Sequence, residues 1–298
     1  METLKERLAK LVYDYSIKEK IADKEFVDQV VEMCVEEFNL RDYVKTLNLD
    51  SDGNNEMIAG YNIENKNLAL DLHTLIGNVI SRVEIESRSG IATSSFLMFV
   101  KVNIDVINSI VHELQHAMQY KKCLTDQEGF DRKILEMSMV KNLSLLRGKA
   151  LTPAEEKYLR TIAILEGDEV FYESLPHERM ANITGLEYDR DISKLLSTRK
   201  KGNLGAYTEA RLLLGKMMGY KECSPTAFAI AANETIKRNV GLPHDIYRID
   251  QVEQELREES ARNNFSLDER LYYGLPISDV EKEQLDNKLA RLKRSLFR

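Results

Sequence analysis

The chain has 298 residues and a formal net charge of −7, with a sequence pI near 5.5. Its composition, 43% hydrophobic and 31% charged, is that of a folded globular protein and excludes a largely disordered one. This length is enough for one large domain or two ordinary ones, with a core that needs no disulfides. The acidic balance argues against a surface that coats nucleic acid, so nucleic acid is not the expected partner.

The first 20 residues and the cysteines indicate the cellular compartment of the protein. Residues 1–20 are charged throughout and lack the apolar core of a secretory signal. The cysteines, Cys34, Cys123 and Cys223, are far apart and form no CxxC pair, which fits a reducing compartment. No apolar run approaches the length of about 18 residues that a membrane span needs. We therefore expect a cytoplasmic protein with no membrane partner.

The first part of the chain is expected to form two helices. Apolar residues within 3–47 recur at steps of three and four, the spacing of one helix face. One run starts at Leu4 and another at Phe26, with a break near Ala22–Asp23. These helices would pack as a scaffold on the rest of the fold.

Short strands are expected next. Residues 50–55, DSDGNN, read as a turn, because the glutamate that closes a calcium loop is missing. Two short apolar segments around the polar turn at 64–67 predict a β-hairpin, and a short helix is expected at 72–80. The β-branched and aromatic segment 94–104, SSFLMFVKVNI, predicts a strand that leads into the following helix.

The second half of the chain is expected to be a helical bundle. Its capping signals include Thr152–Pro153, Ser224–Pro225 and a capping box that begins at Ser278. The segments with apolar residues at helical steps are 128–146, 153–174, 177–198, 205–218, 225–239, 246–262 and 278–296. The predicted fold class is therefore α+β and predominantly α-helical.

The stretch that carries chemistry is HELQH, in which His112, Glu113 and His116 form the pattern HExxH. Histidines four apart on a helix lie one turn above each other, so both imidazoles can bind one metal ion, and zinc is the expected metal. Glu113 can reach a metal-activated water without being a ligand, the position of a general base. The alternative is a pair of surface histidines on an ordinary helix. The apolar positions that predict this helix are Ile107, Ile110, Val111, Leu114 and Met118.

The histidines are expected to face a cleft or solvent, because His116 lies off that apolar stripe by helix geometry. Two histidines leave a catalytic zinc site short of a third protein ligand. Gln119 and Lys122 stand where an HExxHxxGxxH protein needs Gly and His, so the third ligand comes from elsewhere. Cys123, seven residues beyond His116, is expected to be an idle or buried thiol.

The best candidate for the third ligand lies in segment 172–182, YESLPHERMAN. A proline opens a helix there and places Glu178 in its first turn, where its carboxylate could reach a metal held by the neighbouring helix. His177 is the competing ligand. Both alternatives remain open on the sequence alone.

Three motifs carry a resemblance to a known class. HELQHAMQ at 112–119, EGF at 128–130 and Y-x-x-x-P-x-E-x-x-A-N at 172–182 resemble the HExxH zinc metallopeptidases of the gluzincin type. They are similar in particular to the zincin-like domains of phages and mobile elements, which read HExQHxxQ followed by Y…P-x-E-x-E-A-R. The resemblance covers roughly residues 57–190 and implies a zincin-like core with a small sheet and an active-site helix.

Roles follow from this resemblance. It implies His112, His116 and Glu178 as zinc ligands and Glu113 as general base and acid. Asn182 stands where many such enzymes keep an aspartate that orients a ligand histidine, and Met180 replaces the second glutamate of the pattern. Tyr172 matches the family-like tyrosine and is the candidate donor to the oxyanion, with His244 as the alternative.

These observations predict a zinc metallopeptidase that acts on a peptide or protein substrate. The predicted organisation is N-terminal helices at 1–50, a catalytic core at 51–200 and a helical region at 201–298. The alternatives are a non-catalytic zincin-like metal-binding or interaction protein of a phage or mobile element, and a helical interaction protein without metal. Neither the oligomeric state nor the cleavage specificity follows from the sequence.

Overall fold

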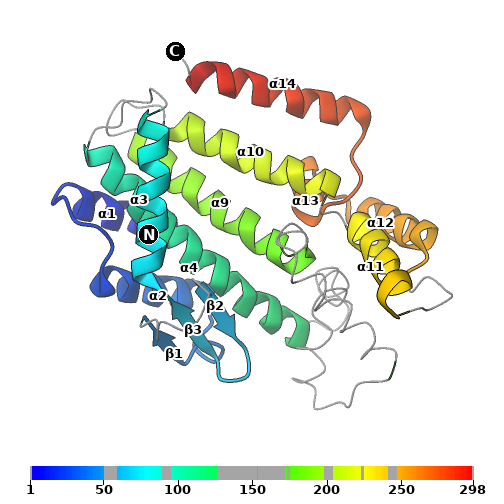
Figure 1. Cartoon of the computed structure of the whole chain (residues 1–298), viewed down its shortest axis with the longest axis horizontal. Helices are drawn as coiled ribbons and strands as arrows, with labels where there is room; N and C mark the ends of the chain where they lie inside the picture. Colours follow the sequence, from blue (N-terminus) through cyan, green and yellow to red (C-terminus); the bar gives the residue numbers. More distant parts are fainter. Residues whose placement is uncertain are drawn as a thin grey trace. The chain divides into compact units, whose positions relative to one another are not determined.

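The computed structural model describes residues 2–49, 59–88, 95–125, 153, 172, 175–197, 204–222, 225–240 and 247–296. Over these ranges the chain is predominantly helical with one three-stranded sheet, which confirms the α+β, mainly helical class (Figure 1). It divides into two compact units. The first is Met1–Met118 with Thr184–Glu209, and the second is Gln119–Ile183 with Ala210–Arg298.

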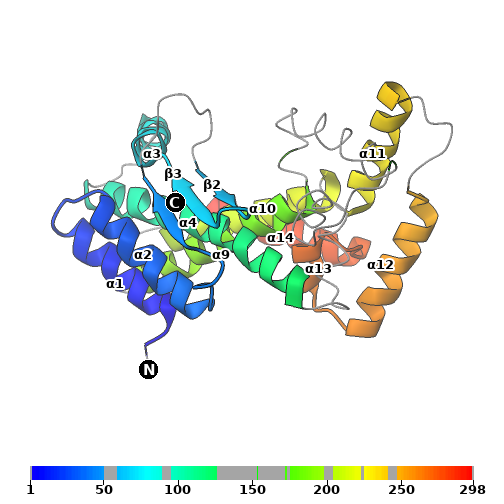
Figure 2. The ribbon, with the colours of Figure 1, turned by 90° about the horizontal axis from the view of Figure 1, so that it is seen from below.

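The first unit begins with the two predicted helices, α1 (Leu4–Ser16) and α2 (Lys24–Glu37). A capping box between Thr3 and Glu6 starts α1, and the carboxylate of Asp23 caps α2 by accepting a backbone N–H at 2.9 Å. The helices lie side by side, as Figures 1 and 2 show. The break predicted near Asp23 is confirmed.

A small sheet follows, made of β1 (Thr46–Asn48), β2 (Ala59–Asn62) and β3 (Asn67–Leu70) in the order β1-β3-β2. The antiparallel pair β2 and β3 is the predicted hairpin, and the side chain of Asn62 accepts two backbone N–H groups of its turn. Strand β1 pairs parallel to β3 and was not predicted, because three residues are too few to show an alternating pattern. The predicted turn at 50–55 lies outside the described residues.

Two helices come after the sheet. Helix α3 (Leu72–Arg88) starts where the short helix was predicted and continues beyond residue 80. Helix α4 (Ser95–Thr125) shows that the predicted strand at 94–104 is wrong, because this segment is the first part of a 31-residue helix.

The reason for this error is burial on several sides of the helix. Val100, Val102, Asn103, Ile104 and Val106 are all at most 2% exposed. A helix buried all round is rich in apolar residues at every step, so its sequence does not differ from that of a buried strand. The tertiary contacts then override the β propensity of its valines and isoleucines.

The side chain of Asn103 shows how α4 is held in the first unit. Its carbonyl oxygen accepts the N–H of Ala22 at 2.7 Å, and its amide donates to the carbonyl of Lys20 at 3.1 Å and to the hydroxyl of Ser16 at 3.3 Å. These bonds satisfy polar groups at the end of α1 and in the loop between α1 and α2, which is why an asparagine is tolerated in the core.

The core of the first unit joins α1, α2, the sheet, α3, α4 and α9 (Pro176–Ser197). Two cation–π contacts add to this packing: the ammonium of Lys5 lies 4.9 Å from the ring centroid of Tyr188 in α9. The ammonium of Lys101 lies 4.8 Å from that of Tyr207, near the start of α10 (Leu204–Glu222). The largest fully buried side chains of this core are Leu8, Phe26, Leu40, Leu68, Leu70, Ile107, Ile110 and Leu114. The apolar stripe predicted for the HELQH helix is therefore part of this core.

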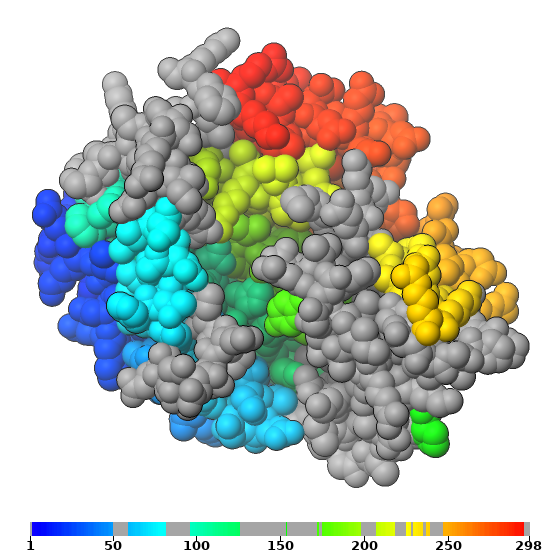
Figure 3. Space-filling model, in the orientation of Figure 1, coloured from blue at the N-terminus to red at the C-terminus, as the bar shows by residue number. Residues whose placement is uncertain are grey.

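Two glycines are expected to respond to alanine in opposite ways. At Gly185 of α9 an added Cβ would meet the side chain of Asn108 and lie 3.0 Å from its carbonyl oxygen, so Gly185→Ala should destabilise the protein by about 1–3 kcal/mol. At Gly77 of α3 nothing lies within 4 Å, and α3 is at the surface of the face shown in Figure 3. Gly77→Ala should stabilise by about 0.5–1 kcal/mol, because alanine loses less backbone entropy in a helix. Urea unfolding measures both, and equal shifts in the two variants would contradict the close approach of α9 to α4.

The second unit is helical in its described residues. Its elements include α11 (Pro225–Val240), α12 (Ile249–Asn263), α13 (Leu267–Tyr273) and α14 (Asp279–Leu296). The predicted helices at 225–239, 246–262 and 278–296 are confirmed, whereas α13 was not predicted because it spans only two turns. An apolar cluster joins α10, α13 and α14 through Ala210, Leu213, Leu271, Leu285 and Leu289.

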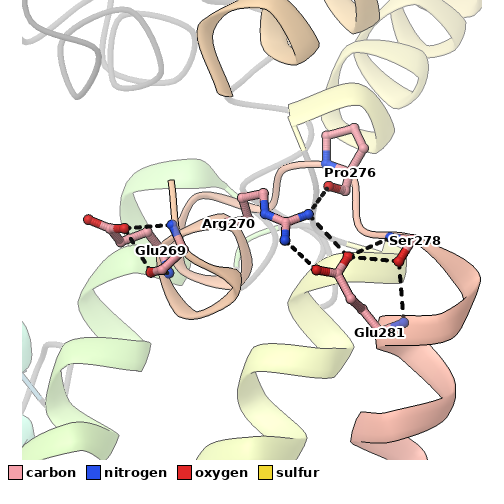
Figure 4. Close-up of polar contacts among 6 residues, drawn as sticks. Glu269, Arg270, Pro276, Ser278 and Glu281 are labelled. Carbon is pink, nitrogen blue, oxygen red and sulfur yellow. Dashed lines mark hydrogen bonds and ion pairs between the residues drawn. The ribbon is translucent and has the colours of Figure 1, made fainter. Parts of the chain in front are cut away.

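An ion pair joins α13 to α14 (Figure 4). The guanidinium of Arg270 donates to both carboxylate oxygens of Glu281, one bond measuring 3.1 Å. The same carboxylate accepts the backbone N–H of Ser278 at 2.9 Å, which completes the predicted capping box. These bonds, from Arg270 first and Ser278 next, lower the pKa of Glu281 from its ordinary 4.5 to about 2.

The ion pair predicts an acid-dependent loss of stability. Since the folded-state pKa of Glu281 is depressed, its contribution is complete above about pH 4.5 and disappears as the pH falls toward 2. Glu281→Gln should therefore lower the free energy of unfolding by about 1 kcal/mol at pH 7, a modest value because the pair is partly exposed. The difference from wild type should shrink between pH 4.5 and pH 2. Urea unfolding at several pH values measures it, with the exposed Glu283→Gln as control, and a difference independent of pH would contradict the pairing.

Two other observations complete the fold. The predicted helix at 128–146, and most of the one at 153–174, lie outside the described residues. Across the described part of the chain, no helix combines the length and hydrophobicity that a membrane span requires.

Candidate metal centre

Helix α4 brings the two predicted histidine ligands together. The Nε2 atoms of His112 and His116 lie 3.2 Å apart, and the two rings meet nearly at right angles with centroids 4.9 Å apart. This follows from their spacing, because residues four apart stack on one helix face. His116 is 8% exposed and His112 is half-buried, so neither ring is freely exposed to solvent.

The spacing of these nitrogens fits a zinc ion. With Zn–N bonds of 2.0–2.1 Å and tetrahedral angles, two imidazole nitrogens on one zinc lie about 3.3 Å apart. The observed 3.2 Å is close to that separation. Nitrogen donors of this kind suit zinc and other late transition metals and do not suit magnesium or calcium.

Glu113 lies beside this pair. Its Oε1 is 3.9 Å from Nε2 of His112, and the ligand atoms of His112, Glu113 and His116 all lie within 4.8 Å of one another. The carboxylate is 7% exposed, so it acts in a largely dehydrated environment where charge interactions are stronger than in water. A buried carboxylate at this distance from two imidazoles could bind the metal, or could exchange a proton with a water between itself and the metal.

The other predicted site residues belong to the second unit and gather at the first turn of α9. Tyr172 donates its hydroxyl to Oε1 of Glu178 at 2.8 Å, and Nε2 of His177 lies 3.4 Å from the same oxygen. Glu178 is 5% exposed, whereas Tyr172 is 43% exposed. The predicted helix start is confirmed, since Pro176 is the first residue of α9.

Two buried residues hold this turn in place, and neither was assigned a role from the sequence. Gln119, 1% exposed, donates its side-chain amide to the carbonyl of His177 at 2.9 Å. Arg179, 4% exposed, donates to the carbonyl of Leu271 in α13. A sequence signal existed for Gln119, because a glutamine on the buried face of an apolar helix needs a hydrogen-bond partner.

The remaining candidates divide into three cases. Cys123 is buried two turns along α4 from His116, about 10 Å by helix rise, and does not belong to the group of His112, Glu113 and His116. Asn182 is half-buried one turn beyond Glu178, and Met180 is buried. His244 and Cys223 lie outside the described residues.

Comparison of the chain with protein-family models, with curated proteins and with solved structures finds no match. The case for a function therefore rests on the HELQH helix and on the groups around it.

Proposed function

We propose that this protein is a zinc-dependent metallopeptidase with a zincin-like core of the gluzincin type. The observation that carries the proposal is the pair of Nε2 atoms 3.2 Å apart, with the Glu113 carboxylate 3.9 Å from one of them. A purely structural zinc site usually closes with four protein ligands and has no use for a carboxylate in this position. An adjacent carboxylate is what hydrolysis requires.

In this proposal Glu178 is the third ligand, and His177 is the alternative. Glu178 is favoured because its carboxylate is almost fully buried and already accepts a hydrogen bond from Tyr172, as ligand carboxylates in metal sites do. The carbonyl that precedes it is bound to Gln119, which stands on α4 three residues after His116.

A zinc ion held by these residues would polarise a substrate carbonyl and make a water molecule acidic near neutral pH. Glu113 accepts the proton of the attacking water and then delivers it to the leaving amine. The hydroxyl of Tyr172 is the candidate donor to the oxygen that becomes negative as the carbonyl is attacked. Its partial exposure leaves it room to turn from Glu178 toward a substrate.

The test is zinc-dependent hydrolysis of a fluorescence-quenched peptide library. Protein loaded with zinc should cleave at least one sequence class, lose that activity with a chelator and regain it when one equivalent of zinc is restored. Zinc-loaded protein that cleaves none of the library would favour the non-catalytic alternative, a zincin-like metal-binding protein of a phage or mobile element.

A further inference from the structure

One side of α4 is partly open to solvent. Between residues 101 and 116 every residue of this helix is buried except Lys101, Asp105, Asn108, Ser109 and His112. All of these are polar, and their spacing of three and four places them in one line along the helix. The line ends at His112, so it leads to the candidate metal centre.

The metal centre is most open on this side. His112 is half-buried, whereas Glu113 and His116 are buried. A helical side chain leans toward the N-terminus of its helix, so the ring of His112 lies over the turn that precedes it. A molecule that reaches a metal on Nε2 of His112 from this side therefore passes residues 108 and 109.

Of these two residues, Asn108 is the one whose polar groups can still bind a ligand. The hydroxyl of Ser109 already donates to the backbone carbonyl of Asp105 at 3.2 Å. The side-chain amide of Asn108 makes no hydrogen bond in the part of the chain that the structure describes. A half-buried amide has lost part of its hydration, so a hydrogen bond from a ligand is favourable there.

Gly185 of α9 determines how this amide is presented, and both residues belong to the first unit. A Cβ at Gly185 would lie 2.2 Å from Oδ1 of Asn108 and 3.1 Å from its Cγ, so the amide oxygen occupies the space beside the glycine. The oxygen, and not the nitrogen, is the nearest side-chain atom. The N–H groups of the amide are therefore the donors left for a ligand.

We propose that Asn108 binds the backbone of the peptide substrate, by donating its side-chain amide to a carbonyl oxygen other than the scissile one. This inference rests on the proposed function and uses only residues of the first unit. Asn108 stands about 6 Å along α4 from His112, and an extended peptide advances about 3.3 Å per residue. The acceptor carbonyl therefore belongs to a residue within about two positions of the scissile bond. Because every residue of a peptide has this carbonyl, the contact recognises the chain and not a particular side chain.

The test is steady-state kinetics of the zinc-loaded protein on a peptide of the library that wild type cleaves. Asn108→Leu keeps nearly the shape of the side chain and removes its N–H donors. It should raise KM by about 3–10-fold, the effect of one lost hydrogen bond, with kcat and zinc affinity unchanged. Ser109→Ala, on the same side of α4, is the control and should leave KM unchanged.

A second measurement locates the acceptor. Peptides in which one backbone carbonyl at a time is replaced by a thioamide, a weaker acceptor, are compared on wild type and Asn108→Leu. One position should raise KM with wild type and have no effect with the variant, because the donor is gone.

The outcomes separate this inference from the proposed function. A wild-type KM in Asn108→Leu, a loss of zinc affinity, or thioamide effects that are equal in both proteins would overturn the role of Asn108 and leave the peptidase standing. Zinc-loaded wild type that cleaves no peptide would overturn both. Circular dichroism establishes folding of each variant, and Asn108→Ala replaces Asn108→Leu if the latter does not fold.

Discussion

Replacing Glu113 by Gln is expected to lower the rate of peptide hydrolysis by about 10²–10⁴-fold while the protein keeps its zinc. Glutamine has the shape of glutamate and cannot accept the proton of the attacking water. Glu113 is not a proposed ligand, so the nitrogens of His112 and His116 still bind the metal. Turnover on a cleaved peptide and zinc content by elemental analysis measure the two effects on one preparation.

The control for this variant is Glu36→Gln, which removes a carboxylate from the exposed face of α2 in the same unit. It should change neither turnover nor zinc content. A Glu113→Gln protein that cleaves peptide at the wild-type rate would remove the general base from the proposed mechanism. One that loses its zinc would instead make Glu113 a ligand, an arrangement that its position 3.9 Å from Nε2 of His112 allows.

His116→Ala is expected to lower zinc affinity by at least about a hundredfold and to abolish hydrolysis. The reason is the geometry of α4, because one imidazole alone cannot provide the pair of nitrogens 3.2 Å apart that fits the ion. Loss of a ligand should cost more than loss of a residue that merely supports one, for which 10–100-fold is usual. Chelator competition measures the affinity.

His73→Ala is the matched control for this second variant. His73 is exposed on α3 and takes no part in the proposed site, so its loss should leave zinc affinity unchanged. A His116→Ala protein that still cleaves peptide in a zinc-dependent way would exclude the HELQH helix as the active-site helix.

Features that neighbouring residues determine were predicted well from the sequence. The HExxH spacing alone was enough to place His112, Glu113 and His116 together, because i and i+4 on a helix are neighbours in any fold. The helix start at Ser278 was predicted from its capping box, and the break near Asp23 from the spacing of apolar residues. The hairpin of β2 and β3 was found through its polar turn. All of these features depend on residues within one or two turns of each other.

What was missed depends on distant contacts. The segment 94–104 was predicted as a strand, since burial on several sides of α4 makes its pattern look like a buried strand. Strand β1 is three residues long and forms because it pairs in parallel with β3. The roles of Gln119 and Arg179 follow from bonds to residues 58 and 92 positions away, and no local pattern reveals such bonds.

The candidate site therefore has a part that the structure brings together and a part that stays a prediction. His112, Glu113 and His116 form one group in the first unit. Glu178, His177 and Tyr172 form another at the start of α9 in the second unit. That both groups serve one metal ion, with Glu178 as its third ligand, is the central claim of the proposal.

The most direct test of that claim is the metal content of the purified protein by elemental analysis, measured on wild type, Glu178→Ala and His177→Ala. We predict about one zinc per chain in wild type, a similar content in His177→Ala and loss of zinc in Glu178→Ala. Loss of zinc in His177→Ala alone would make His177, and not Glu178, the third ligand. Wild-type protein that carries no zinc even after zinc is supplied would contradict the metallopeptidase and favour a helical interaction protein.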